Sequence, residues 1–210
     1  MAIITLNTRA INRSDTASSD QVWTATSATA SDFQDAAGGS HTLLTTTNVT
    51  SAASEVAFTS GIDSTYRRYK VTWDSLIPAT DSATLRVQIY VGGAYKTDSY
   101  YNYFNREFNS GGSVGIEDAK TGSYFRIMND GTGSSTGENA NGELIIFTPS
   151  DTTEKKSCYW NCSHTRNDGE MCRSLGTGNY SNGESAMTGL KFYMSSGNID
   201  TALFKLYGIT

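Results

Sequence analysis

Alternating apolar and polar residues recur along the chain from about Thr42 onward, and this pattern most constrains the fold. Residues 85–91 read Leu-Arg-Val-Gln-Ile-Tyr-Val, and residues 69–75 read Tyr-Lys-Val-Thr-Trp-Asp-Ser. Successive side chains of a β-strand point to opposite faces of a sheet, so each segment has one apolar and one polar face. Residues 69–75 are expected to keep this alternation through Ser75.

Glycine-containing turn signals separate these segments. Gly92-Gly93 predicts a two-residue hairpin turn because both glycines accept positive φ, and Asn129-Asp130-Gly131 marks a further turn. We expect about ten short strands and no helix longer than a turn or two. Such spacing predicts an all-β antiparallel sandwich or barrel, and it excludes parallel α/β folds, which need crossover helices.

The composition limits the classes of partner that the protein is expected to bind. Charged residues make up 18% of the 210 residues, the net charge is −5, and no cluster of Lys and Arg exceeds two residues. Nucleic-acid binding normally requires a basic patch, so no nucleic-acid partner is expected. No signal peptide and no apolar run of about 20 residues is visible, so we expect no membrane insertion. Three cysteines, an odd number, argue against a disulfide framework.

The N-terminal segment differs from the rest of the chain. Residues 14–40 are dominated by Ser, Thr, Ala and Asp, with isolated apolar residues at Val22, Trp23 and Phe33. A segment of this composition cannot bury enough surface to fold alone. We therefore expect an extended N-terminal arm over residues 1–40, which packs on its own domain or on a neighbouring subunit, and a β-sandwich domain over residues 41–210.

The cysteines raise the question of a metal site. Cys158, Cys162, His164 and Cys172 lie within residues 158–173. On one strand Cys158 and Cys162 would be about 13 Å apart, at ~3.3 Å per residue. Zinc requires ligands at about 2.3 Å from one centre, so one strand cannot supply both thiolates.

The register of the hairpin determines which face of the sheet the third cysteine, Cys172, occupies. If Asp168-Gly169 forms a two-residue turn, Thr165 pairs with Cys172, which then lies on the face opposite to Cys162 and His164. A regular hairpin of this register cannot assemble a zinc site. The sequence therefore predicts neither a metal nor a cofactor, and the thiols are interpreted as small strand residues.

No catalytic motif is visible. The pattern Gly-x-Ser-x-Gly occurs at residues 111–115 and 133–137, but a nucleophile elbow joins a strand to a helix, and no helix is expected here. The second histidine, His41, lies far in sequence from any nucleophile. Carboxylates such as Glu117 and Asp118 leave a glycosidase pair open as an alternative. We expect a protein that is not an enzyme and has no catalytic residues.

Two segments offer binding side chains. The aromatic segment 100–106 combines Tyr with Asn and Arg, which suit stacking on sugars or packing on protein. The alternative is that its aromatic residues fill the core or a trimer interface. The loop 130–141 is a second candidate, because long loops on a rigid sandwich often carry recognition. The candidate binding residues are Tyr100, Tyr101, Tyr103, Arg106, Asp130 and Asn139.

Two further segments resemble a known family. Residues 55–66 read Glu-Val-Ala-Phe-Thr-Ser-Gly-Ile-Asp-Ser-Thr-Tyr, and residues 194–200 read Met-Ser-Ser-Gly-Asn-Ile-Asp, followed by Phe204-Lys-Leu-Tyr-Gly-Ile209. Together they resemble virion structural proteins of tailed bacteriophages, of the tail-fibre or receptor-binding type. The resemblance spans about residues 55–210. It implies a jelly-roll-like β-sandwich that assembles as a homotrimer, without enzymatic activity.

The resemblance also implies a function and a location. The expected role is a tail-fibre or receptor-binding protein, made in the bacterial host cytoplasm and incorporated into the virion, that contacts a host surface glycan or protein. The alternatives are a capsid decoration or head-fibre protein and, from another class, a polysaccharide-degrading enzyme. In the first two roles, the N-terminal arm would attach to other virion proteins through Val22, Trp23 and Phe33.

Overall fold

A computed structural model describes residues 21–25 and 31–35, for their backbone only, and residues 40–210 in full. Every regular element in these ranges is a β-strand. These residues contain no helix that is long and apolar enough to cross a membrane. The strands are β1 (Gln21–Ala25), β2 (Ser31–Asp35), β3 (His41–Val49), β4 (Val56–Phe58), β5 (Arg68–Pro78), β6 (Leu85–Val91), β7 (Ala94–Tyr95), β8 (Tyr101–Asn109), β9 (Val114–Gly122), β10 (Phe125–Arg126), β11 (Ala140–Phe147), β12 (Lys156–Thr165), β13 (Met171–Tyr180), β14 (Met187–Met194) and β15 (Ile199–Ile209).

Strands β1 and β2 pair antiparallel, with Trp23 opposite Phe33 in the backbone register. The predicted N-terminal arm otherwise falls outside the described residues. Residues 40–210 form a separate compact unit that contains the remaining strands.

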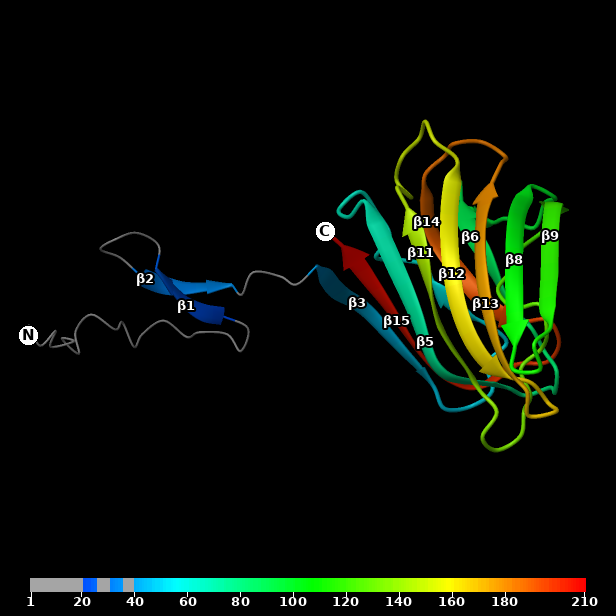
Figure 1. The fold of residues 1–210 in the computed structure, drawn as a ribbon. Coiled ribbons are helices and arrows are strands. Elements are labelled where there is room, and N and C mark those ends of the chain that lie inside the picture. The colour runs from blue at the N-terminus through cyan, green and yellow to red at the C-terminus, as the bar shows by residue number, and fades with distance from the viewer. Residues whose placement is uncertain (1–20, 26–30, 36–39) are drawn as a thin grey trace, which may run out of the picture. The chain divides into compact units, whose positions relative to one another are not determined.

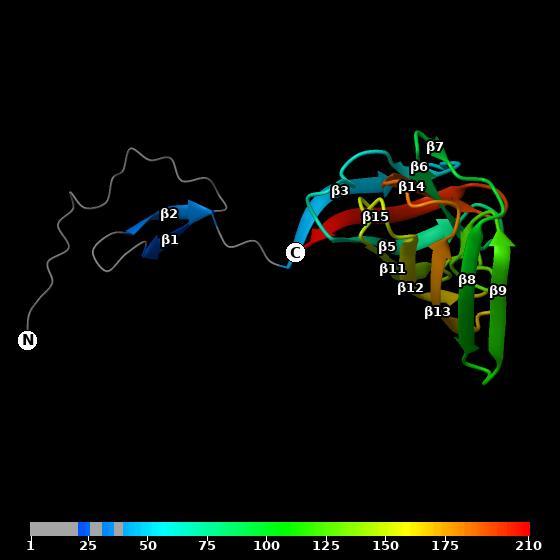
Figure 2. The same cartoon turned by 90° about the horizontal axis from the view of Figure 1, so that it is seen from above.

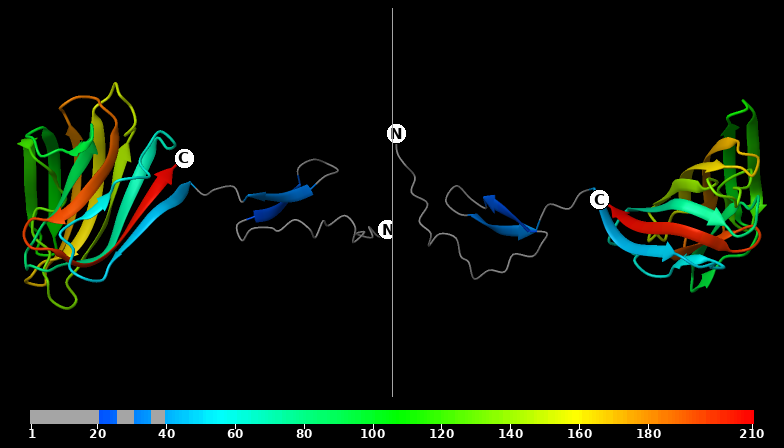
Figure 3. Two further views of the ribbon diagram at one scale, coloured as in Figure 1. Left: turned by 180° about the vertical axis from the view of Figure 1, so that it is seen from behind. Right: turned by 90° about the horizontal axis from the view of Figure 1, so that it is seen from below.

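Two antiparallel sheets build this unit. The large sheet has the order β3-β15-β5-β11-β12-β13-β8-β9, which can be followed across Figure 1, and the small sheet has the order β10-β6-β14-β4, with β7 paired to β6. Strands β3 and β9 form the two edges of the large sheet (Figure 3). The large sheet is strongly twisted: in Figure 2, β3 and β15 run nearly horizontally, whereas β8 and β9 run nearly vertically.

The chain crosses repeatedly between the two sheets. Strands β3, β15, β5 and β11 are neighbours in one sheet, and β4, β14, β6 and β10 are neighbours in the other. This arrangement of eight strands in two sheets is that of a jelly roll. The predicted all-β, antiparallel jelly-roll-like sandwich is therefore confirmed. Strands β12, β13, β8 and β9 extend the large sheet beyond the jelly roll.

The predicted alternation explains most of the core. Leu85, Val87, Ile89 and Val91 on β6 all point inward and are buried. On β5 the alternation ends earlier than predicted, because Ser75 is exposed and has φ of 51°. The register of β5 shifts beside this residue, as at a β-bulge, so the next buried side chain is Leu76. The prediction for Ser75 was wrong for that reason.

Two glycines of the large sheet make room for tryptophan rings. Gly176 on β13 is the cross-strand partner of Trp160, and Gly142 on β11 is the partner of Trp73. A Cβ atom at either glycine would overlap the facing indole ring. Both tryptophans are buried, so neither ring can move away without disturbing the core.

Replacing Gly176 by alanine is therefore expected to lower the free energy of unfolding by roughly 1–3 kcal/mol through overpacking. Urea-induced unfolding followed by Trp fluorescence measures the change. The control is Ser163→Ala on β12, which changes an exposed side chain and should leave stability within about 0.5 kcal/mol. Equal stability of the two variants would show that the indole does not occupy this space.

Candidate functional site

The loop between β12 and β13 sets which side chains face the interior at one end of the sheet. Arg166 N–H donates to the Glu170 carbonyl at 2.9 Å, and Gly169 N–H donates to the Arg166 carbonyl at 3.0 Å. Gly169 has φ of 82°. These bonds define a three-residue loop, Asn167 to Gly169, in which the glycine takes the left-handed position after a turn. The predicted two-residue Asp168-Gly169 turn was wrong.

The longer loop shifts the hairpin register by one residue. Thr165 pairs with Met171, and His164 pairs with Cys172. A shift of one residue moves side chains to the other face, so Cys172 points to the interior with Cys162 and His164. The prediction that Cys172 lies on the opposite face was therefore wrong.

A third functional side chain joins this pair from β8. Glu107 pairs with Ser174 on β13, two residues along the strand from Cys172. One ligand-type atom from each of Glu107, His164 and Cys172 lies within 4.8 Å of the others. His164 Nε2 is 3.8 Å from Glu107 Oε2. We call these three residues the buried triad, because their exposed fractions are 1–3%.

The carboxylate of the triad is held by three donors. Glu107 Oε2 accepts from Asn129 N–H at 3.0 Å and from the Ser174 hydroxyl, and Oε1 accepts from Asp130 N–H at 3.1 Å. Burial raises the pKa of Glu107, while these donors act in the opposite direction. The bonds fix the carboxylate on β8 and attach the segment after β10 to the large sheet.

The imidazole of the triad has no such support. Neither ring nitrogen of His164 has a hydrogen-bond partner among the residues that the structure describes. Burial lowers the pKa of His164 to about 4, while the charge of Asp130 and the nearby Asp130 backbone, which does not reach hydrogen-bond geometry, act in the opposite direction. The ring is therefore neutral at neutral pH. A buried polar side chain without a partner costs free energy, so this histidine needs an explanation.

The thiol of the triad is also shielded. Burial raises the pKa of Cys172 to about 12, so the thiol is protonated at neutral pH and is a weak nucleophile. With all three side chains almost fully covered, the triad does not present a reactive atom to a substrate. Its donor set of sulfur, nitrogen and oxygen instead matches the ligands of a transition metal.

An ion-pair network covers the end of the sheet beside the triad. Arg166 contacts Asp130 at 3.3 Å, Asp168 at 3.0 Å and Glu170 at 2.9 Å. Glu170 also accepts from Gly111 N–H at 2.7 Å, which links the β12–β13 loop to the β8–β9 turn. Both turns lie at the lower end of the sheet in Figure 1.

The predicted binding residues fall in four different places. Tyr101 and Tyr103 point into the core, Tyr100 is 47% exposed before β8, and Arg106 lies on the outer face of β8. The Asp130 backbone reaches Glu107, and the Asn139 carbonyl accepts from Thr165 N–H at 3.0 Å, so both lie near the β12–β13 loop. The structure therefore does not gather these residues into one surface. The side chains of Val22, Trp23 and Phe33 lie outside the described residues.

The outer face of β8, β9 and β13 carries exposed apolar side chains that the sequence analysis did not single out. Cross-strand pairs place Phe108 beside Val114, and Arg106 between Ile116 and Leu175. Their exposed fractions range from 37% to 62%, which is high for apolar residues on neighbouring strands. We define the outer apolar face as Phe104, Phe108, Val114, Ile116, Met171 and Leu175.

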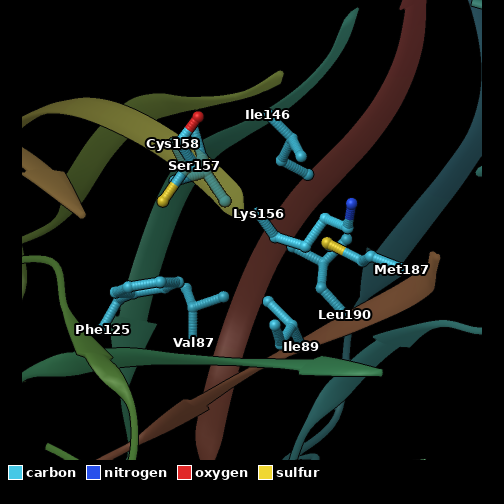
Figure 4. Close-up of a pocket in the computed structure, with 10 residues that line it drawn as sticks. Val87, Ile89, Phe125, Ile146, Lys156, Ser157, Cys158, Met187 and Leu190 are labelled. Atoms are coloured by element: carbon cyan, nitrogen blue, oxygen red, sulfur yellow. The ribbon is translucent and has the colours of Figure 1, made fainter. Parts of the chain in front are cut away.

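A small cavity between the sheets offers no ligand site. Figure 4 shows Lys156 and Cys158 from β12 beside side chains of the small sheet, including Val87 and Met187. The cavity holds about 10 Å³, on the order of one water molecule. Lys156 Nζ turns to the Glu154 carbonyl at 2.9 Å and to the Asp151 carbonyl. The cavity belongs to the core.

No family model, no curated protein and no solved structure matches this chain.

Two functional features were missed in the sequence. Glu107 was overlooked because it lies between Arg106 and Phe108, which are on the outer face of β8, although the alternation Tyr101, Tyr103, Asn105, Glu107 places it on the inward face. A carboxylate on the face that the buried tyrosines share is the signal that points to it. Val114 and Ile116 of the outer apolar face were overlooked because β9 is otherwise polar.

Proposed function

We propose that this protein is a non-enzymatic structural component of a bacteriophage virion, which assembles as a homotrimer and binds the host surface as a tail-fibre or receptor-binding protein. The resemblance of residues 55–66 and 194–200 to such proteins supports the virion role. The jelly-roll sandwich is compatible with it. The observation that carries the assembly part is the outer apolar face.

The position of this face favours contact between subunits. It lies at one edge of the large sheet, where β9 has no neighbouring strand on its outer side among the described residues. Sheet edges of soluble proteins are normally protected by charge or by a covering segment. Here Val114 and Ile116 are 54% and 55% exposed on the edge strand itself. Such an edge is stabilised when another subunit covers it.

Three-fold symmetry suits apolar side chains of this kind. Near a three-fold axis each side chain meets copies of itself, and apolar residues can do so without repulsion between like charges. The guanidinium of Arg106 lies over the Phe104 ring at 5.1 Å. The charge therefore lies beside the aromatic surface, and the aliphatic residues of β9 remain available for the contact.

Ile116→Asp is expected to convert the trimer into monomers, because three carboxylates would be buried together at the subunit contact. Size-exclusion chromatography with light scattering measures the mass of the 22.7 kDa chain and of its assembly. The matched control is Leu43→Asp, since Leu43 is 52% exposed on the opposite edge strand, β3. A monomeric wild-type protein, or a trimer that survives Ile116→Asp and dissociates with Leu43→Asp, would contradict the assigned interface.

The receptor-binding role is tested separately. Purified protein should adsorb to host cells and inhibit infection in proportion to the amount bound. An electron-microscopy map of the particle should place the protein on the tail. Many copies on tailless heads, together with no adsorption, would replace this role with capsid decoration.

A further inference from the structure

We propose that Glu107, His164 and Cys172 bind one Zn²⁺ ion, which joins β8, β12 and β13 at the end of the large sheet. This site is independent of the proposed function. Its basis is the convergence of a carboxylate, an imidazole and a thiol from three strands, with donor atoms within 4.8 Å of one another.

The geometry is close to that of a zinc centre. Zinc bonds of about 2.0–2.3 Å in a tetrahedron hold neighbouring ligand atoms roughly 3.3–3.8 Å apart. His164 Nε2 and Glu107 Oε2 are already 3.8 Å apart. His164 and Cys172 are directly opposite each other in the β12–β13 pair, so their side chains start from adjacent Cβ atoms. Small rotations of side chains complete the site without moving a strand.

The unpartnered imidazole is the second, independent observation. His164 is 2% exposed, and both of its ring nitrogens lack hydrogen-bond partners among the described residues. A zinc ion bound to the nitrogen that carries the lone pair provides a partner for one of these two atoms.

The charges of the site balance when zinc binds. Zinc displaces the proton of the Cys172 thiol, so the ligands become one thiolate, one carboxylate and one neutral imidazole. Two negative charges then offset the two positive charges of the ion, which suits a buried position. Thiolate and imidazole ligands favour zinc over magnesium or calcium. A water molecule fills the fourth position.

The surroundings hold the carboxylate ready. Asn129 N–H, Asp130 N–H and the Ser174 hydroxyl all donate to Glu107. Backbone and hydroxyl donors of this kind orient metal-binding carboxylates in known centres.

The first test uses cobalt as a spectroscopic substitute for zinc. Full-length protein is treated with a chelator, dialysed and titrated with Co²⁺. We expect saturation at one equivalent, with a thiolate-to-cobalt charge-transfer band and intense tetrahedral d–d bands. Cys172→Ser should lose the charge-transfer band and His164→Gln should bind at least tenfold more weakly, while the control Cys158→Ser, a buried thiol outside the triad, should behave as wild type.

The second test requires no variant, so it holds even if a substitution prevents folding. X-ray absorption of the zinc-loaded wild-type protein should show one sulfur at about 2.3 Å and nitrogen or oxygen at about 2.0–2.2 Å. Excess zinc should raise the melting temperature by roughly 5–10 °C, given ligand at about a hundred times its Kd and a domain of this size. Absence of stoichiometric binding, a zinc shell without sulfur, or an unchanged charge-transfer band in Cys172→Ser would overturn the site.

Discussion

Trp160→Ala is expected to lower the free energy of unfolding by roughly 3–5 kcal/mol, as for other large aromatic residues removed from a core. Trp160 is 1% exposed, and its ring centroid lies 6.1 Å from that of Phe125. The ring also covers Gly176, which has no side chain to fill the space that alanine would leave. Thermal unfolding should show a decrease in melting temperature of roughly 6–20 °C.

Tyr159→Ala provides the matched control, because it changes the neighbouring residue on the same strand. Tyr159 points to the outer face and is 43% exposed, and its ring centroid lies 5.7 Å from that of Phe147. We expect a loss of about 1 kcal/mol or less. A similar loss in both variants would mean that β12 does not place Trp160 inside and Tyr159 outside.

The core of the jelly roll was the predictable part of the fold. The period of two in residues 85–91 and 69–73 identifies which side chains are buried, because the pattern follows from strand geometry alone. Gly92-Gly93 also forms the predicted two-residue turn, with φ of 60° and 84°, between Val91 and Ala94. At these positions the local sequence pattern alone predicts the burial and the turn that the fold contains.

The buried triad was not predictable for a specific reason. Asp168-Gly169 accepts either a two-residue or a three-residue loop, because both need a residue with positive φ. The side-chain bond from Glu170 N–H to Asp168, at 3.1 Å, and the contacts of Arg166 accompany the longer loop. A difference of one residue decides whether Cys172 faces His164 or the solvent. Glu107 arrives only through the pairing of β8 with β13, which no local pattern specifies.

Glu107→Ala is expected to lower the free energy of unfolding by roughly 2–3 kcal/mol in the presence of a chelator, so that metal binding does not contribute. The substitution leaves Asn129 N–H, Asp130 N–H and the Ser174 hydroxyl without their acceptor. Each buried donor without a partner costs about 1–3 kcal/mol, and the relief of burying a carboxylate offsets part of the sum. Urea unfolding at neutral pH measures the loss.

Glu117→Ala on the adjacent strand β9 separates this effect from the loss of any carboxylate. Glu117 pairs with Arg126 at 2.9 Å, but both side chains are partly exposed, so the expected loss is about 0–1 kcal/mol. The difference between the two variants therefore measures what burial adds to a hydrogen-bonded carboxylate. If zinc binds the triad, added zinc should stabilise wild type and Glu117→Ala equally, and Glu107→Ala much less. The difference in the free energy of unfolding between Glu107→Ala and wild type should therefore be larger with zinc than with a chelator. If Glu107→Ala loses the same free energy of unfolding with and without zinc, Glu107 only anchors the segment after β10 and does not bind the metal.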